Sequence, residues 1–172
     1  TCLTTSALRQ IWKRENPAKT WADLSSELPA ETISLYGPGP DSGTFDYFVE
    51  QILGADGIRD DFTPSEDDNV LVEGIAGDVN ALGYVGGVYY QENQEILTAL
   101  AIDNGNGNCV LPTPETIEDR SYNPLTRPLS IYVRADALER PEVREFIRFY
   151  LREAPTLAPE IGYVAAPDEV YA

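Results

Sequence analysis

The feature that most constrains the fold is a short apolar strand that runs into a Gly/Pro loop and then into a helix. Ile33, Leu35 and Tyr36 have the character of a brief strand. Residues 37–40 read Gly-Pro-Gly-Pro, which continues neither a strand nor a helix. Apolar residues then follow the i, i+3, i+4, i+7 spacing of one helix face, at Phe45, Phe48, Val49 and Ile52. This strand–loop–helix order is a building unit of α/β folds.

Short strands alternate with helices along the rest of the chain. Thr4 or Thr5 can cap a first helix, and Ser65 approximates a capping box with Asp68. Pro141 begins the best apolar helix stripe in the chain. Strands are predicted over residues 81–85, 97–102 and 128–134, the last from strict apolar alternation. The alternation predicts the α/β class, with one compact unit as the simplest organisation that the residues alone suggest.

The helix start after the Gly/Pro loop is a candidate anion site. The first amides of a helix have no internal partners, and the helix dipole adds partial positive charge there. Gly43 leaves its N–H open, and the hydroxyls of Ser42 and Thr44 add donors. A plain capped helix is the alternative. Asp41 would repel a fully ionised anion but would accept the proton of a protonated oxyanion, and the lack of Gly-Lys-Ser/Thr excludes a P-loop.

The composition removes several classes of function. The 172 residues contain no His, which excludes a Ser-His-Asp triad, a His metal ligand and a His proton shuttle. With 29 acidic against 12 basic residues, the net charge of −17 argues against nucleic acid or an anionic membrane as a partner. The acidic run at 65–69 lacks the glycine and spacing of a calcium loop, so helix-start charge is the favoured interpretation. We expect no metal, no cofactor and no catalytic residue.

Cys2 and Cys109 form the only possible cysteine pair. Two cysteines without His make a poor zinc site. A disulfide is therefore expected, which would imply an oxidising compartment; two buried free thiols are the alternative. Because the sequence contains no Met, we expect that Thr1 is not a translation start and that a signal peptide was removed or a longer chain precedes it. No apolar run approaches the roughly 20 residues that cross a bilayer.

Several segments resemble the PstS-type substrate-binding proteins of phosphate ABC transporters. The resemblance lies in residues 36–48 (YGPGPDSGTFDYF), 65–70 (SEDDNV), 81–85 (ALGYV), 124–133 (PLTRPLSIYV) and 162–164 (GYV), and in Tyr89 and Tyr90. It covers essentially the whole chain, and several of these motifs are specific to the family.

The resemblance implies a periplasmic-binding-protein-like fold of the second type, in which two α/β lobes clamp phosphate between them. Residues 1–122 would form the second lobe and residues 123–172 a segment that returns to the first lobe, so the fold would be incomplete. Ser42, Gly43 and Thr44 correspond to the family's phosphate ligands at a helix N-terminus. Many family members carry an Arg in the preceding loop, where residues 38–40 offer none; Arg59 or Arg127 is expected to supply the charge.

The function implied by the resemblance is binding of inorganic phosphate for ABC-transporter uptake, outside the cytoplasm in a periplasmic or extracellular location. The partners would be a membrane permease and a missing N-terminal lobe, on the same precursor or on another chain. A scaffold or assembly subunit derived from such a lobe, without a role in transport, is the alternative. We do not expect an enzyme. The choice between phosphate and another tetrahedral oxyanion stays open, because the family's proton acceptor lies outside this chain.

Overall fold

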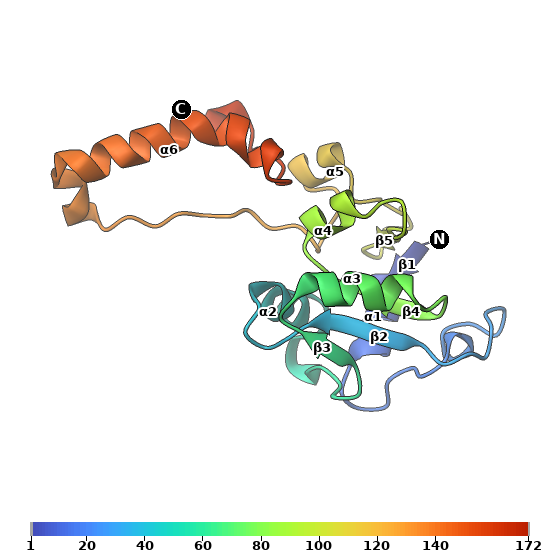
Figure 1. Cartoon of the computed structure of the whole chain (residues 1–172). Coiled ribbons are helices and arrows are strands. Elements are labelled where there is room, and N and C mark those ends of the chain that lie inside the picture. Colours follow the sequence, from blue (N-terminus) through green and yellow to red (C-terminus); the bar gives the residue numbers. More distant parts are fainter. Residues whose placement is uncertain (1, 172) are drawn as a thin grey trace.

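The computed structural model describes residues 2–171 and is built around two small parallel sheets (Figure 1). The larger sheet has the strand order β3-β2-β4, with β2 in the centre. Tyr36 of β2 lies opposite Thr63 of β3, and Leu35 lies opposite Leu82 of β4. The smaller sheet pairs β1 with β5. The strand bounds are β1 Cys2–Thr4, β2 Ser34–Pro38, β3 Thr63–Ser65, β4 Ala81–Gly83 and β5 Ala101–Asp103.

Between residues 2 and 171, six α-helices connect and flank these strands. They are α1 Thr5–Trp12, α2 Gly43–Phe48, α3 Asp68–Ala76, α4 Gly87–Glu92, α5 Pro114–Glu118 and α6 Pro141–Glu160. A π-helical turn, η2 (Val49–Leu53), continues α2 directly. Short 3₁₀ turns occupy Trp21–Asp23, Gly54–Asp56, Ala135–Glu139 and Asp168–Val170. Both sheets are parallel and helices connect their strands, so the predicted α/β class is confirmed.

The hydrophobic core is centred on Trp12, which is 1% exposed. Its indole packs edge-on against the rings of Phe48, Phe62 and Tyr84, with centroids 5.1 to 5.6 Å apart. Tyr84 also stacks on Phe48 at 3.9 Å. Edge-to-face and offset stacked pairs add stabilisation beyond the area that they bury. The core therefore joins α1, the end of α2 and the residue after β4 into one body, and so holds α2 beside the sheet.

Local sequence signals placed most of these elements correctly, with small shifts at their ends. Thr4 caps α1 and accepts a hydrogen bond from the amide of Ala7 at 3.0 Å. The predicted cap at Ser65 is wrong: Asp67 caps α3, because Ser65 is the last residue of β3 and its hydroxyl bonds to the backbone of Asp67. The strand predicted over 97–102 is shorter and shifted, at Ala101–Asp103.

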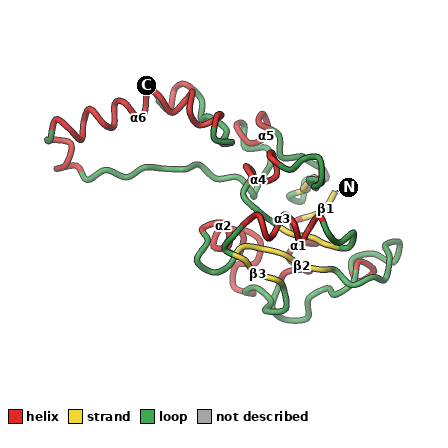
Figure 2. Tube along the Cα trace, in the orientation of Figure 1, coloured by secondary structure: helices red, strands yellow, loops and turns green. Residues whose placement is uncertain are grey.

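The predicted strand over residues 128–134 is wrong in this structure. The segment is extended, but within residues 2–171 no strand pairs with it, and Tyr132 is 94% exposed. Figure 2 shows it as a long loop that leads away from the body to α6. A period-2 pattern produces a strand only where a neighbouring strand supplies the hydrogen-bond ladder.

Helix α6 forms where the apolar stripe predicted it, but no residue of α6 is buried. Phe146 and Tyr150 of the stripe are exposed, and so are the neighbouring apolar side chains Phe149 and Leu157. The expectation of one compact unit is therefore wrong for this part of the chain, since the core is formed by residues between Leu3 and Ile102, with Tyr122 and Leu125 packed against it. Of the helices within residues 2–171, none combines the length and the apolar character needed to cross a bilayer.

Candidate anion-binding site

The start of α2 lies just beyond the carboxyl end of the central strand β2 (Figure 1). Ser42 is the N-cap: its backbone is extended, at φ −91° and ψ 129°, and its Oγ accepts a hydrogen bond from the amide of Thr44 at 3.1 Å. The amide of Ser42 donates to the carbonyl of Gly39 at 3.0 Å, which closes the turn between strand and helix. In α/β sheets ligands bind at this end of the strands. The local structure predicted around Ser42, Gly43 and Thr44 is thus present.

Arg127 lies against the same helix start, although it is far from it in sequence. Its Nη2 is 3.0 Å from the place that a Cβ on Gly43 would occupy. Its guanidinium carbon is 5.2 Å from the ring centroid of Tyr47, one helical turn further along α2. Gly43 therefore has a second role besides an open amide, because any larger residue would require the guanidinium to shift by a few tenths of an ångström.

Arg127 differs from most arginines of the chain in having no acidic partner. Within residues 2–171 no carboxylate forms an ion pair with it. Six other arginines do pair with Asp or Glu: Arg9, Arg59, Arg134, Arg140, Arg148 and Arg152. In so acidic a chain, this leaves Arg127 with positive charge available at the helix start.

The structure does not bring Arg59 to this group. Its side chain is 6% exposed, and its Nη1 donates to the carbonyls of Ile11 and Ala18, each at 2.9 Å. Its Nε and Nη2 donate to the carboxylate of Asp61. These hydrogen bonds hold the pKa of Asp61 below its ordinary value. The expectation that Arg59 supplies charge to the anion site is corrected here, because its donors are occupied by the end of α1 and by Asp61.

A carboxylate from the segment after β3, Glu66, lies over the loop before α2. The Glu66 side chain occupies the space that a side chain on Gly39 would need, and its Oε1 accepts a hydrogen bond from the amide of Asp41 at 3.3 Å. Asp41 itself is exposed. The sequence predicts only helix-start charge for the acidic run that contains Glu66. Nothing local in the sequence reveals that the run folds over the Gly/Pro loop, which depends on the β2–β3 pairing of Pro38 with Ser65.

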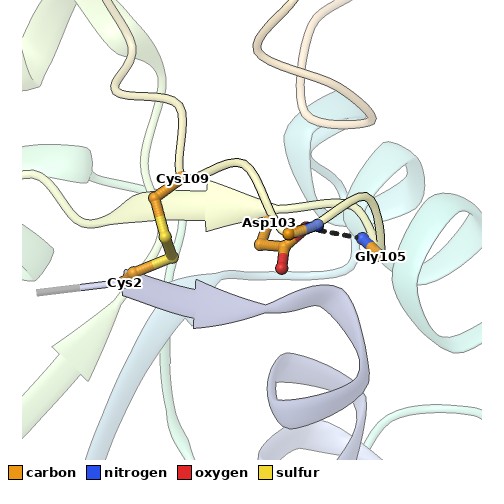
Figure 3. The surroundings of a disulfide bond; sticks show 5 residues. Cys2, Asp103, Gly105 and Cys109 are labelled. Carbon is orange, nitrogen blue, oxygen red and sulfur yellow. Dashed lines mark hydrogen bonds between the residues drawn. A yellow bond between two sulfur atoms is a disulfide. The ribbon is translucent and has the colours of Figure 1, made fainter.

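Cys2 and Cys109 form the predicted disulfide, with Cα atoms 5.8 Å apart (Figure 3). It ties β1 to the chain that follows β5. Beside it, Asp103 accepts hydrogen bonds from the amides of Gly105 and Gly107, at 2.8 and 3.0 Å. Across residues 2–171 no group of three or more His, Cys, Asp or Glu side chains is arranged to hold a metal ion.

The parallel sheets, the helix start at the strand's carboxyl end and Arg127 beside it define an α/β domain with a candidate ligand site at the end of a strand. A family model described as PBP superfamily domain matches residues 1–154. The chain therefore belongs to the PBP superfamily.

Similar proteins agree with the PstS-type resemblance. Protein SphX of Synechocystis is 46% identical over 173 residues, which cover 98% of this chain and 51% of the relative. The phosphate-binding protein PstS of Staphylococcus haemolyticus is 35% identical over 170 residues, which cover 98% of this chain and 52% of the relative. The chain thus spans about half the length of the curated relatives it matches.

Solved structures give the same result for the fold. The crystal structure of a possible phosphate binding protein from Planctomyces limnophilus has a TM-score of 0.87 and 42% identity, and the match covers 99% of this chain and 61% of that one. PstS from Borrelia burgdorferi has a TM-score of 0.73 at 21% identity, covering 97% of this chain and 64% of that one, and supports the fold alone. The incomplete binding-protein-like α/β fold is confirmed.

Proposed function

We propose that the chain binds inorganic phosphate at the start of α2, as part of an extracytoplasmic solute-binding protein of a phosphate ABC transporter. The observation that carries this proposal is the position of Arg127. Its guanidinium stands over Gly43 at a helix start and has no ion-pair partner within residues 2–171, in a chain of net charge −17. A charge-assisted donor beside open amides and the positive end of a helix is suited to an oxyanion.

Each residue of the site has a distinct part in this proposal. The hydroxyl oxygen of Ser42 accepts from the amide of Thr44, so its own hydrogen remains available to donate to phosphate. The Thr44 hydroxyl and the Gly43 amide add two further donors, and Arg127 supplies the charge. Asp41 is proposed as the acceptor for a proton of the bound anion, which would favour protonated phosphate over sulfate.

The relatives support the transport role. SphX and PstS match the chain along 98% of its length, and PstS carries the name of a phosphate-binding protein. We infer from them that the partners are a phosphate ABC permease and a further lobe, and that the location is periplasmic or extracellular. Nothing in the family's role as a solute receptor calls for catalysis, so no enzyme activity is proposed.

The division of the chain at residues 122 and 123 is part of the same proposal. Residues 123–172 would return to the other lobe, which fits the exposed segment 128–134 and the unburied helix α6. Tyr122 and Leu125, close to this division, still pack against the core.

Titration calorimetry of the 172-residue chain with inorganic phosphate tests the proposal. We expect Arg127→Ala to weaken binding about 10- to 100-fold, because a hydrogen bond to a charged group contributes about 1.5–3 kcal/mol. Arg134→Ala is the matched control, since Arg134 is 83% exposed and lies in the extended segment. Binding that is unaffected by Arg127→Ala would contradict the site. No phosphate heat from the unaltered chain would overturn its phosphate binding and favour the scaffold alternative.

A further inference from the structure

Tyr47 contacts the Arg127 segment with both parts of its side chain. Its hydroxyl lies 2.8 Å from the carbonyl oxygen of Pro124 and 2.6 Å from that of Thr126. A carbonyl oxygen only accepts, so the phenol is the donor in both contacts and its single hydrogen is shared between the two oxygens. The hydroxyl thus fixes the backbone immediately before Arg127 against α2.

The ring of Tyr47 contacts the guanidinium itself. The guanidinium carbon of Arg127 lies 5.2 Å from the ring centroid, within the range of a cation–π contact. Tyr47 follows Gly43 by four residues, so the two lie on one face of α2. The guanidinium therefore rests on a surface that Tyr47 and Gly43 form together. Burial raises the pKa of the Tyr47 phenol, and the charge of Arg127 offsets part of that rise.

Without such contacts, little would hold Arg127 in place. The residue is exposed, its side chain is long and flexible, and within residues 2–171 it has no carboxylate partner. The chain beyond it, from Pro128 to Arg134, is extended and unpaired. The contacts with Tyr47 and Gly43 are those that the structure records for the guanidinium.

We infer that Tyr47 is a positioning residue: it anchors residues 124–126 through its hydroxyl and supports the Arg127 guanidinium through its ring, so that the positive charge stays at the start of α2. The effect that we expect on phosphate affinity rests on the proposed function. The contact between Tyr47 and Arg127 does not depend on that function and is tested without ligand.

The test is a pair of double-mutant cycles on the 172-residue chain. In the first, Tyr47→Phe is measured by calorimetry with inorganic phosphate in the Arg127 and Arg127→Ala backgrounds. We expect the variant to weaken binding about fivefold where Arg127 is present and to have no effect beyond about twofold where it is absent. Tyr132→Phe, at a side chain that is 94% exposed, is the control and leaves affinity unchanged.

The second cycle uses urea unfolding without phosphate, with Tyr47→Leu and Arg127→Ala. We expect a coupling of about two- to fivefold in the unfolding equilibrium constant, the range of a partly exposed cation–π pair. An unaltered chain that does not bind phosphate overturns the proposed function, whereas this cycle still tests the contact. Additive effects in the second cycle, or a Tyr47→Phe effect on phosphate that is equal in both backgrounds, overturn the positioning role.

Discussion

Two Arg-x-Asp pairs of this chain have the same spacing and the same hydrogen bonds but differ in burial. In each pair, the Nε and Nη2 of arginine donate to the two carboxylate oxygens, from Arg59 to Asp61 and from Arg134 to Asp136. The side chain of Arg59 is 6% exposed, whereas that of Arg134 is 83% exposed. We predict that replacement of each arginine by alanine has very different effects on stability.

The expected loss in the free energy of unfolding follows from the hydrogen bonds that each arginine makes. Arg59→Ala removes the donor to the buried carbonyls of Ile11 and Ala18. Each hydrogen bond from a charged donor contributes about 1.5–3 kcal/mol. The carboxylate of Asp61 is 55% exposed and keeps its water, so leaving it unpaired adds little. We expect a loss of about 3–5 kcal/mol in the free energy of unfolding, and a change too small to resolve for Arg134→Ala.

Urea unfolding at pH 7, followed by the fluorescence of the buried Trp12, measures both variants. A similar loss in both variants would refute the reasoning, because it would mean that burial and the two carbonyl contacts do not matter. Under conditions where Arg59→Ala stays folded, it should also bind phosphate as the unaltered chain does. A specific loss of phosphate binding would instead return Arg59 to the site.

Three further predictions follow. Reduction of the Cys2–Cys109 disulfide, or Cys2→Ser with Cys109→Ser, should lower the free energy of unfolding by about 4–5 kcal/mol in the chain-entropy model, because the two residues are 107 positions apart. Urea unfolding with and without reductant measures this loss, and equal unfolding midpoints would contradict it. Gly43→Ala places a methyl group 3.0 Å from Nη2 of Arg127 and should weaken phosphate binding about three- to tenfold. Gly87→Ala, also at the first position of a helix but with open space around it, should leave the affinity unchanged. Calorimetry with phosphate on both variants tests this, and equal affinities would contradict it. Because Arg59 lowers the pKa of folded Asp61, their interaction stabilises the fold fully above the unfolded pKa of about 4 and is lost as pH falls through the folded pKa. The difference in stability between the unaltered chain and Arg59→Ala should therefore narrow slightly below about pH 4, by less than about 1 kcal/mol because Asp61 is 55% exposed, while the larger part due to the two carbonyls remains. A difference that widens in acid unfolding curves, or that disappears, would contradict this.

The parts of the site that local sequence could predict are those made by neighbouring residues. Ser42 as a cap, Gly43 as an open amide and the turn before them depend on interactions spanning only a few positions, so their identities were sufficient. Arg59 and Arg127 could not be told apart in this way. Arg59 is buried against α1 because it bonds to carbonyls 41 and 48 positions away in the sequence. Arg127 lies on α2 because the residues just before it pack on Tyr47.

The same distinction explains the errors. Residues 128–134 have the alternation of a strand, and α6 has the stripe of a buried helix, yet in this structure both are exposed. A pattern records which face of an element is apolar but does not provide the surface that covers it. The predicted cap at Ser65 is wrong for a related reason, because the pairing of Ser65 with Pro38 in the sheet makes Ser65 the last residue of β3.

By itself, the amino-acid sequence determined the α/β class, most helices and strands, the cysteine pair and the capped helix start at Ser42. These depend on covalent geometry, backbone preference and periodicity over short stretches of chain. Only the tertiary structure decided which arginine reaches that helix start, that Tyr47 lies beneath it, and that Glu66 folds over the loop. Those outcomes require distant segments to meet, and a segment's own residues do not specify its partner.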